Sequence, residues 1–193
     1  MKTILSVILI FFSFSSFSQI KFEKEKDDFT GASSVNTHYT FIDKIRQSEN
    51  KSEQKKYNQI GNRLALSMKY QKTDQQEVYW VNLILNKVDL GCLSKYDGKM
   101  LVLLEDGTSL EFHQVSQTDC SSDYSKVSYS LISKEGFESL DDEGYLNKKL
   151  REFKEKSIKK IRVHGTKYYA DFDISEEKKF ILADNVNTIE SNK

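Results

Sequence analysis

The pattern of apolar and polar residues along the chain is clearest between Lys99 and Val115. Five consecutive apolar residues, Met100 to Leu104, lead into Asp106-Gly107, and Ser109 to Phe112 then alternate polar with apolar. Asp-Gly between two such stretches predicts a tight β-hairpin with a two-residue turn, because those residues tolerate positive φ. The uninterrupted apolar run also predicts a strand that is covered on both faces. We therefore expect this hairpin to lie in the middle of a sheet.

Further strands are predicted where apolar and polar residues alternate with a period of two. Between Arg63 and Tyr70 the apolar residues fall on one face, which predicts a half-buried strand. Val78 to Leu85 is mostly apolar on both faces and should be a central strand. The other expected strands cover residues 20–23, 34–41, 125–132, 158–164 and 168–174. Residues 43–61 are rich in Lys, Gln, Asn and Ser, which leaves an exposed loop and a loosely packed helix as alternatives.

Helical spacing replaces alternation in the last third of the chain. Helices are expected from Ser133 to Leu140, from about Asp141 to Lys156, and after Ser175, which can cap a terminal helix. The expected buried stripes are Leu146, Leu150 and Phe153 in the second helix, and Leu182, Val186 and Ile189 in the last. Together, these elements predict an α+β fold: a largely antiparallel sheet built on hairpins, with helices on one face, including a C-terminal helix.

The C-terminal hairpin has a register that its apolar residues determine. If residues 165–168 form a four-residue loop, Ile161 faces Phe172 on the side that covers the core. A slip of one residue would turn Phe172 away from that side. The pairs expected on the opposite side are Arg162 with Asp171, Lys160 with Asp173, and His164 with Tyr169.

The first 18 residues have the pattern of a secretory signal peptide. Lys2 supplies a positive charge, and Ile4 to Phe14 form an apolar core of about 11 residues, fewer than the ~20 that span a bilayer. Small residues at the end of the segment predict cleavage between Ser18 and Gln19. The alternative, an N-terminal anchor helix, is disfavoured by the short run and its Ser-rich end. Residues 19–193 then form a single exported α+β domain.

The residues around the cleavage site indicate where the exported protein is expected to be located. No cysteine lies near the cleavage site, so we expect a periplasmic or secreted protein rather than a lipoprotein. No later stretch of the sequence is long and apolar enough to span a membrane after processing.

Cys92 and Cys120 are the two cysteines of the chain. They lie at nearly equal distances from the Asp106-Gly107 turn, so hairpin pairing places them opposite one another at its open end. Export makes a disulfide permissible, and we predict one between them. Two free buried thiols are the alternative. A catalytic cysteine is disfavoured, because neither residue has a nucleophile context.

Composition narrows the classes of protein that the chain can belong to. Lys plus Arg and Asp plus Glu number 29 each, so no overall charge favours nucleic acid or an anionic membrane. Hydrophobic residues at 38% suffice for a sizeable core. The one strong basic cluster, Lys148 to Arg162, is interrupted by Glu152 and Glu155. Because no aromatic platform accompanies it, we interpret the cluster as a solvated helix face rather than as an anion site.

Short motifs resemble a known group of proteins. Asp27-Asp28-Phe29-Thr30-Gly31 follows the signal, and Ile132-Ser133-Lys134-Glu135 precedes Ile158-Lys159-Lys160-Ile161-Arg162. Together with the Ser-Phe-Ser-Gln end of the signal, they are similar to small exported proteins of unknown function from the Bacteroidota. The resemblance implies an envelope or secreted location, and no activity, cofactor or site residue. It also indicates that residues 141–156 are a helix inserted relative to that group.

Candidate chemistry centres on the C-terminal hairpin. Asp171 and Asp173 share one side of a strand, as a metal site or an acid–base pair requires, and His164 is in the same hairpin. The competing interpretation is an exposed face where each aspartate has a cationic partner, which lowers a carboxyl pKa and suits a structural role. His38, His113 and His164 lack zinc-ligand spacing with one another or with a cysteine. The sequence contains no phosphate loop, nucleophile elbow or cofactor motif.

The sequence therefore predicts an exported, non-catalytic module that binds a protein or an envelope component, without a cofactor or nucleic acid. The alternative is a hydrolase or metal-dependent enzyme built on Asp171, Asp173 and His164. The two hypotheses differ in geometry. A catalytic carboxylate pair should line a concave pocket, whereas a structural pair should lie on a flat strand surface.

Overall fold

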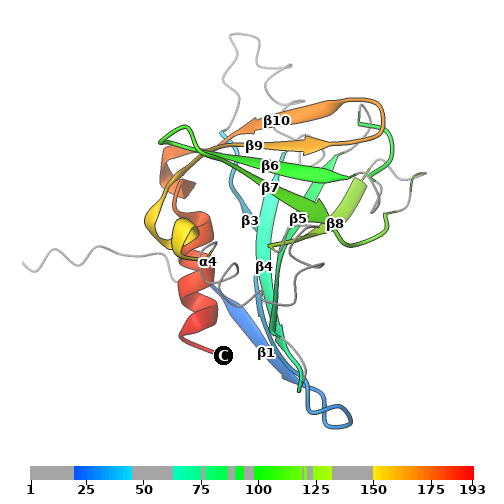
Figure 1. The fold of residues 1–193 in the computed structure, drawn as a ribbon, viewed down its shortest axis with the longest axis vertical. Coiled ribbons are helices and arrows are strands. Elements are labelled where there is room, and N and C mark those ends of the chain that lie inside the picture. The colour runs from blue at the N-terminus through cyan, green and yellow to red at the C-terminus, as the bar shows by residue number, and fades with distance from the viewer. Residues whose placement is uncertain are drawn as a thin grey trace, which may run out of the picture.

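The structure, a computed structural model, describes residues 20–44, 63–74, 77–86, 90–93, 98–118, 120, 124–131 and 150–193. Within these ranges ten strands form one antiparallel sheet, and a C-terminal helix packs against it (Figure 1). The strands are β1 (Phe22–Lys26), β2 (Ser33–Thr37), β3 (Thr40–Phe41), β4 (Ala65–Lys72), β5 (Glu77–Asn86), β6 (Lys99–Leu104), β7 (Ser109–Gln114), β8 (Tyr124–Ser130), β9 (Ile158–His164) and β10 (Tyr169–Asp173). The helical segments are residues 150–155, the 3-10 helix η2 (Glu176–Lys178) and α4 (Ile181–Glu190).

The predicted hairpin of β6 and β7 lies inside the sheet. The strand order is β1-β2-β4-β5-β8-β7-β6-β9-β10, with β3 also paired to β4. Pairing of Met100 with Phe112 gives the register that the sequence predicts. The expectation that β6 is covered on both faces is wrong. Met100 and Val102 are buried, but Leu101 and Leu103 on the other face remain half-buried. Their cross-strand partners are polar, Glu111 and Arg162 for Leu101 and Ser109 and Lys160 for Leu103.

The turn of this hairpin is also longer than predicted. The N–H of Leu104 donates to the carbonyl of Thr108 at 2.9 Å, so three residues rather than two form the loop. Gly107 has a φ of 87°, whereas Asp106 does not take positive φ. Instead the Asp106 carboxylate accepts the N–H of Thr108 at 2.9 Å, which favours a three-residue loop with glycine in the left-handed position.

Residues 40–44 tie the two ends of the structure together. The single strand predicted over residues 34–41 is divided, because the chain leaves β2 and forms β3 against β4. The N–H of Ile42 donates to the carbonyl of Leu64 at 3.1 Å, and its carbonyl accepts the N–H of Ser175 at 3.0 Å. The start of β4 and the residues after β10 therefore share one bridging segment.

A buried ion pair holds this bridging segment in place. The Asp43 carboxylate is buried and accepts the N–H of Leu64 at 3.1 Å. Arg63 donates from Nε to the same carboxylate at 3.3 Å, and its guanidinium lies 4.6 Å from the centre of the Phe41 ring. The charge of Asp43 is thus matched within the fold, as a buried carboxylate requires.

The core lies between the sheet and α4. Leu66 and Met68 on β4 are fully buried, as the alternation predicts, and α4 contacts β4 and β2. The stripe of α4 that the spacing predicts is confirmed as buried, and it consists of Leu182, Val186 and Ile189. Phe153 of the helical residues 150–155 is also buried and stacks on Phe112, with ring centres 5.6 Å apart.

Several predicted boundaries change. The first strand covers β1 rather than residues 20–23, because an edge strand tolerates the charged sequence Phe-Glu-Lys-Glu-Lys. Ser175 precedes η2 and forms no side-chain cap, so α4 begins only at Ile181. The predictions for the signal segment 1–18, the stretch 45–61 and the helical region 133–149 lie outside the described residues.

Candidate functional site

The two aspartates of the enzyme hypothesis lie on an exposed strand face. The register of β9 and β10 is the predicted one, with Asp171 opposite Arg162 and Asp173 opposite Lys160. Arg162 donates from Nε and Nη2 to the two carboxylate oxygens of Asp171, at 2.6 and 2.8 Å. Lys160 Nζ lies 3.6 Å from the Asp171 carboxylate and 3.5 Å from that of Asp173. Each aspartate therefore has a cationic partner.

These contacts also set the electrostatics of the hairpin. The hydrogen bonds from Arg162 are the main reason why the pKa of Asp171 is lowered, and Lys160 adds to the effect. The guanidinium of Arg162 in turn lies 4.0 Å from the centre of the Tyr169 ring. The Asp173 side chain is 62% exposed. This arrangement matches a surface ion-pair network more closely than an acid–base pair.

The histidines are not gathered into one site. His164 pairs with Tyr169, and His113 pairs with Lys99 on the strand between them. Burial and the nearby Lys99 ammonium lower the pKa of His164. His38 lies instead beside β1, with Nε2 3.3 Å from the Glu23 carboxylate. In the ranges that the structure describes, no three His, Cys, Asp or Glu side chains are close enough together to hold a metal ion.

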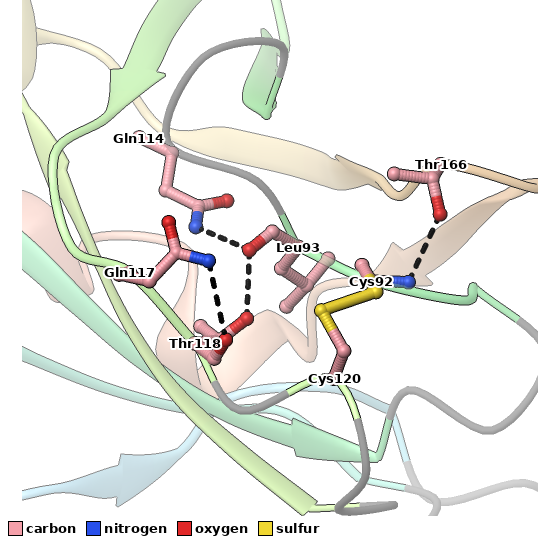
Figure 2. Close-up of a disulfide and its surroundings, with 7 residues drawn as sticks. All are labelled: Cys92, Leu93, Gln114, Gln117, Thr118, Cys120 and Thr166. Carbon is pink, nitrogen blue, oxygen red and sulfur yellow. Dashed lines mark hydrogen bonds between the residues drawn. A yellow bond between two sulfur atoms is a disulfide. The ribbon is translucent and has the colours of Figure 1, made fainter.

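Cys92 and Cys120 are brought together as the sequence predicts. Figure 2 shows the two sulfur atoms joined, and the Cα atoms are 4.8 Å apart. The pair links the segment before β6 to the segment after β7. In the same view the carbonyl of Leu93 accepts hydrogen bonds from Gln114 Nε2 at 2.8 Å and Thr118 Oγ1 at 2.7 Å.

The cysteine segment is also docked on the turn between β9 and β10. The N–H of Cys92 donates to Thr166 Oγ1 at 3.0 Å, and the N–H of Thr166 donates to the carbonyl of Cys92 at 2.9 Å. Gly165 permits this approach, because a Cβ there would overlap the carbonyl of Leu90. The cysteine pair therefore fastens three connections of the sheet and has a structural role.

A polar hollow of about 530 Å³ lies where Asn36, Ser67 and Asn82 come together on neighbouring strands, at positions that alternate with the buried Val35, Leu66 and Leu83. The residues that line it are all of polar types: Glu23, Asn36, Thr37, His38, Tyr39, Ser67 and Asn82. They come from β1, β2, β4 and β5 and from the connection after β2. The register brings them together, because Ser67 pairs with Asn82 and Asn36 with the neighbouring Lys69.

A second hollow of about 410 Å³ lies on the same strands, toward the tip of the β1–β2 hairpin. Glu25, Ser34, Lys69 and Gln71 are among its lining residues. Ser34 Oγ donates to the Glu25 carboxylate at 3.4 Å, and Asn36 of the first hollow donates to Ser34 Oγ at 3.4 Å. The two hollows thus share one network of hydrogen bonds.

Aromatic rings accompany these polar groups. Trp80 pairs with Lys69, whose Nζ lies 5.8 Å from the centre of the indole. Tyr39 lines the first hollow and is hydrogen-bonded to Ser67, although burial outweighs this bond and raises the pKa of its phenol. Asn82 accepts a hydrogen bond from Ser128 Oγ at 2.7 Å through Oδ1, which fixes the orientation of its amide. We call this whole surface the outer polar face.

The outer polar face has no direct signature in the sequence. Its residues are distant along the chain, and none belongs to a motif with catalytic or metal-binding spacing. The available signal was the alternation itself, which assigns Ser67 and Asn82 to the sides of their strands that face away from the core.

The basic cluster is dispersed rather than gathered at a site. Lys156 Nζ pairs with Asp106 at 2.9 Å, and Lys160 and Arg162 pair with the aspartates of β10. Lys148, Lys149 and the expected cleavage site at Ser18 and Gln19 lie outside the described residues. In the part of the chain that the structure describes, no helix combines the length and apolar character needed to cross a bilayer.

Comparison with known proteins gives no assignment. The chain matches no family model, no curated protein and no solved structure. Any function must therefore be inferred from its own residues.

Proposed function

We propose that the protein is an exported, non-catalytic module that binds a neutral, hydroxyl-rich component of the cell envelope or its surroundings, such as a glycan. The proposal rests on one observation: two adjoining hollows on the same sheet face are lined almost entirely by hydrogen-bonding side chains. The signal-like pattern of residues 1–18 supports export, and the length of the chain supports a single mature domain.

The chemistry of the outer polar face favours a polar ligand over an apolar one. Sites for apolar small molecules are lined mainly by hydrophobic side chains, whereas Ala32 and Tyr39 are the only such residue types among the lining residues of these hollows. Amide, hydroxyl and carboxylate groups together can both donate to and accept from the hydroxyls of a sugar. Trp80 and Tyr39 add ring faces against which the C–H groups of a sugar ring can pack.

The charges disfavour an anionic ligand. Glu23, Glu25 and Asp27 line the two hollows, and Lys69 is the one lysine among their lining residues. The excess of carboxylates repels anions, whereas the uncharged hydroxyls of a sugar can donate hydrogen bonds to these groups.

The test is affinity electrophoresis of the mature protein in gels that contain neutral polysaccharides, followed by calorimetry with oligosaccharides of the retained type. Asn82→Ala should weaken binding about 3- to 10-fold, since it removes hydrogen-bonding groups from the lining of the first hollow. Ser109→Ala, on an exposed position of β7, is the matched control and should bind like the wild type. Equal retardation of the two variants, or none of the wild type by any neutral polysaccharide, would refute the proposal.

A further inference from the structure

The hairpin of β1 and β2 carries a fully exposed aromatic ring at its tip. Figure 1 shows this hairpin extending beyond the rest of the sheet. Phe29 lies in its turn and is 101% exposed, so the ring contacts almost nothing in its own molecule. Exposure of so large an apolar group is unfavourable in water, and its burial in a complex would recover that free energy.

The turn that presents Phe29 is internally bonded. Asp27 Oδ1 accepts the N–H groups of Phe29 and Thr30 at 2.8 and 3.0 Å. The N–H of Gly31 donates to the carbonyl of Asp27 at 2.8 Å, and Gly31 takes the positive φ of 70° that the turn requires. Because the turn is already ordered, docking of the ring costs little additional conformational entropy.

The surroundings of Phe29 are acidic. Asp27 and Asp28 precede it, and the hydrogen bonds from the backbone of the turn lower the pKa of Asp27. Two carboxylates beside the ring disfavour insertion into an anionic membrane surface. They favour a protein pocket with an apolar floor and cationic groups at its edge.

The same chain contains a groove of this kind. It has a volume of about 780 Å³ and lies between the start of α4 and the chain segments before β1 and after β2. Ile20, Ile181 and the half-exposed ring of Phe180 give it apolar surface. Lys21, Lys154 and Lys178 line it as well, against the acids Glu177 and Asp184. Cations are therefore in excess at its edge.

We propose that Phe29 of one copy docks in this groove of a second copy. The ring would cover the apolar floor, and the two aspartates of the tip would meet the lysines at the edge. Tip and groove are different surfaces, so each joined pair retains one free tip and one free groove, and association continues as an open chain. A single hairpin tip buries less area than the ~1,200 Å² of stable complexes, so the association should be weak.

The first experiment is analytical ultracentrifugation of the mature protein across a wide concentration range. The wild type should show average mass that rises with concentration and falls back when salt is added, because the aspartate–lysine contacts are screened. Phe29→Ser should remain monomeric. Tyr168→Ser, which removes another exposed aromatic ring in a turn, is the matched control and should associate like the wild type.

The second experiment is complementation between two blocked variants. Phe29→Ser keeps a working groove, and Lys178→Glu keeps a working tip but reverses a charge at the groove. Each should be monomeric alone, and an equimolar mixture should form 1:1 dimers that grow no further. A wild type that stays monomeric up to about 1 mM, or a Phe29→Ser variant that associates normally, would overturn the proposal. Flotation of the monomer with lipid vesicles in a Phe29-dependent manner would also overturn it and assign the tip to a membrane.

Discussion

Tyr79 on β5 donates a hydrogen bond from its hydroxyl to the carboxylate of Glu190 at the end of α4, 111 residues further along the chain. Lys193 completes the contact, with Nζ 3.2 Å from the Tyr79 hydroxyl and 3.0 Å from the Glu190 carboxylate. The same ammonium lies 5.5 Å from the centre of the Tyr70 ring. The final turn of the helix is thereby fastened to the sheet.

Removal of this hydroxyl should destabilise the protein. Tyr79→Phe removes one of the two donors to the Glu190 carboxylate and leaves Lys193 as the other. Because the lost hydrogen bond is to a charged group, we expect a loss of about 1.5 to 3 kcal/mol in the free energy of unfolding. Urea denaturation at neutral pH measures it. Tyr168→Phe, at an exposed position, is the control and should change the value by less than about 0.5 kcal/mol.

The same contact predicts a loss of stability at alkaline pH. Burial raises the pKa of Tyr70 to about 12, and burial together with the Glu190 bond raises the pKa of Tyr79 as well. Both hydroxyls hold their protons more tightly in the folded than in the unfolded state. Their contribution to the free energy of unfolding is therefore complete below about pH 10, the pKa of an unperturbed tyrosine. For Tyr70 this contribution is lost as the pH rises through about 12, and for Tyr79 the loss likewise begins above about pH 10. The unfolding free energy of Tyr79→Phe should fall less steeply over this range. If the free energy of unfolding of the wild type and of Tyr79→Phe falls equally steeply with pH, the raised pKa of Tyr79 is contradicted.

The Cys92–Cys120 pair should be oxidised in the exported protein. Alkylation without reductant should label no thiol, and labelling of both cysteines would contradict the prediction. The pair closes a loop with a sequence separation of 28, for which loop entropy gives about 3.5 kcal/mol of stabilisation. The Cys92→Ser, Cys120→Ser double variant should therefore unfold at a clearly lower urea concentration.

Gly165→Ala should disturb the docking of the cysteine segment on the turn between β9 and β10. The added methyl group would overlap the carbonyl of Leu90, whose carbonyl carbon lies 2.8 Å from the Cβ position. Backbone atoms cannot rotate away as a flexible side chain does, so we expect a cost of about 1 to 3 kcal/mol. Thermal unfolding measures it, with Tyr168→Ala in the same turn as a control of small effect. A Gly165→Ala variant that is as stable as the wild type would contradict the close contact between residue 165 and the carbonyl of Leu90.

Asp171→Asn separates the structural and catalytic interpretations of the β10 carboxylates. The Arg162 bonds lower the pKa of Asp171 in the folded state, so its contribution is present above about pH 4 and disappears as the pH falls through the lowered value. The free energy of unfolding, measured by urea denaturation, should be about 0.5 to 1 kcal/mol larger for the wild type than for Asp171→Asn at neutral pH. This difference should disappear in acid, where Asp171 is protonated. A melting temperature that divalent metal raises only when Asp171 and Asp173 are both present would favour the enzyme hypothesis instead.

The mature chain should begin at Gln19. The intact mass of protein recovered from the envelope or the medium should correspond to loss of residues 1–18. A processed fraction in which those residues are retained would contradict the prediction.

Local alternation explains why much of the sheet was predictable. Leu66 and Met68 are buried where a period of two places them, and the Ile161–Phe172 pair sets the predicted register of β9 and β10. Such pairs lie close in sequence, so turn length and apolar pattern suffice to align them. The same reasoning placed Cys92 opposite Cys120.

Pairings between distant segments were not predictable in this way. The contacts of β5 with β8 and of β6 with β9 depend on how completed hairpins pack together. Ile42 forms hydrogen bonds on both sides, to Leu64 and Ser175, yet no feature of the sequence around it predicts such a bridge. The outer polar face has the same origin, because Asn36, Ser67 and Asn82 become neighbours only when three strands align.

The bridge at Ile42 has a consequence for the order in which the molecule can be completed during synthesis. One of its two partners, Ser175, is made long after Ile42 itself, and α4, which covers the apolar side of β4, follows later still. Until those residues emerge, the early strands present Leu66 and Met68 without a cover. A nascent or truncated chain should therefore expose apolar surface, which makes it prone to aggregation and proteolysis. Both risks end when α4 has been synthesised and packs against the sheet.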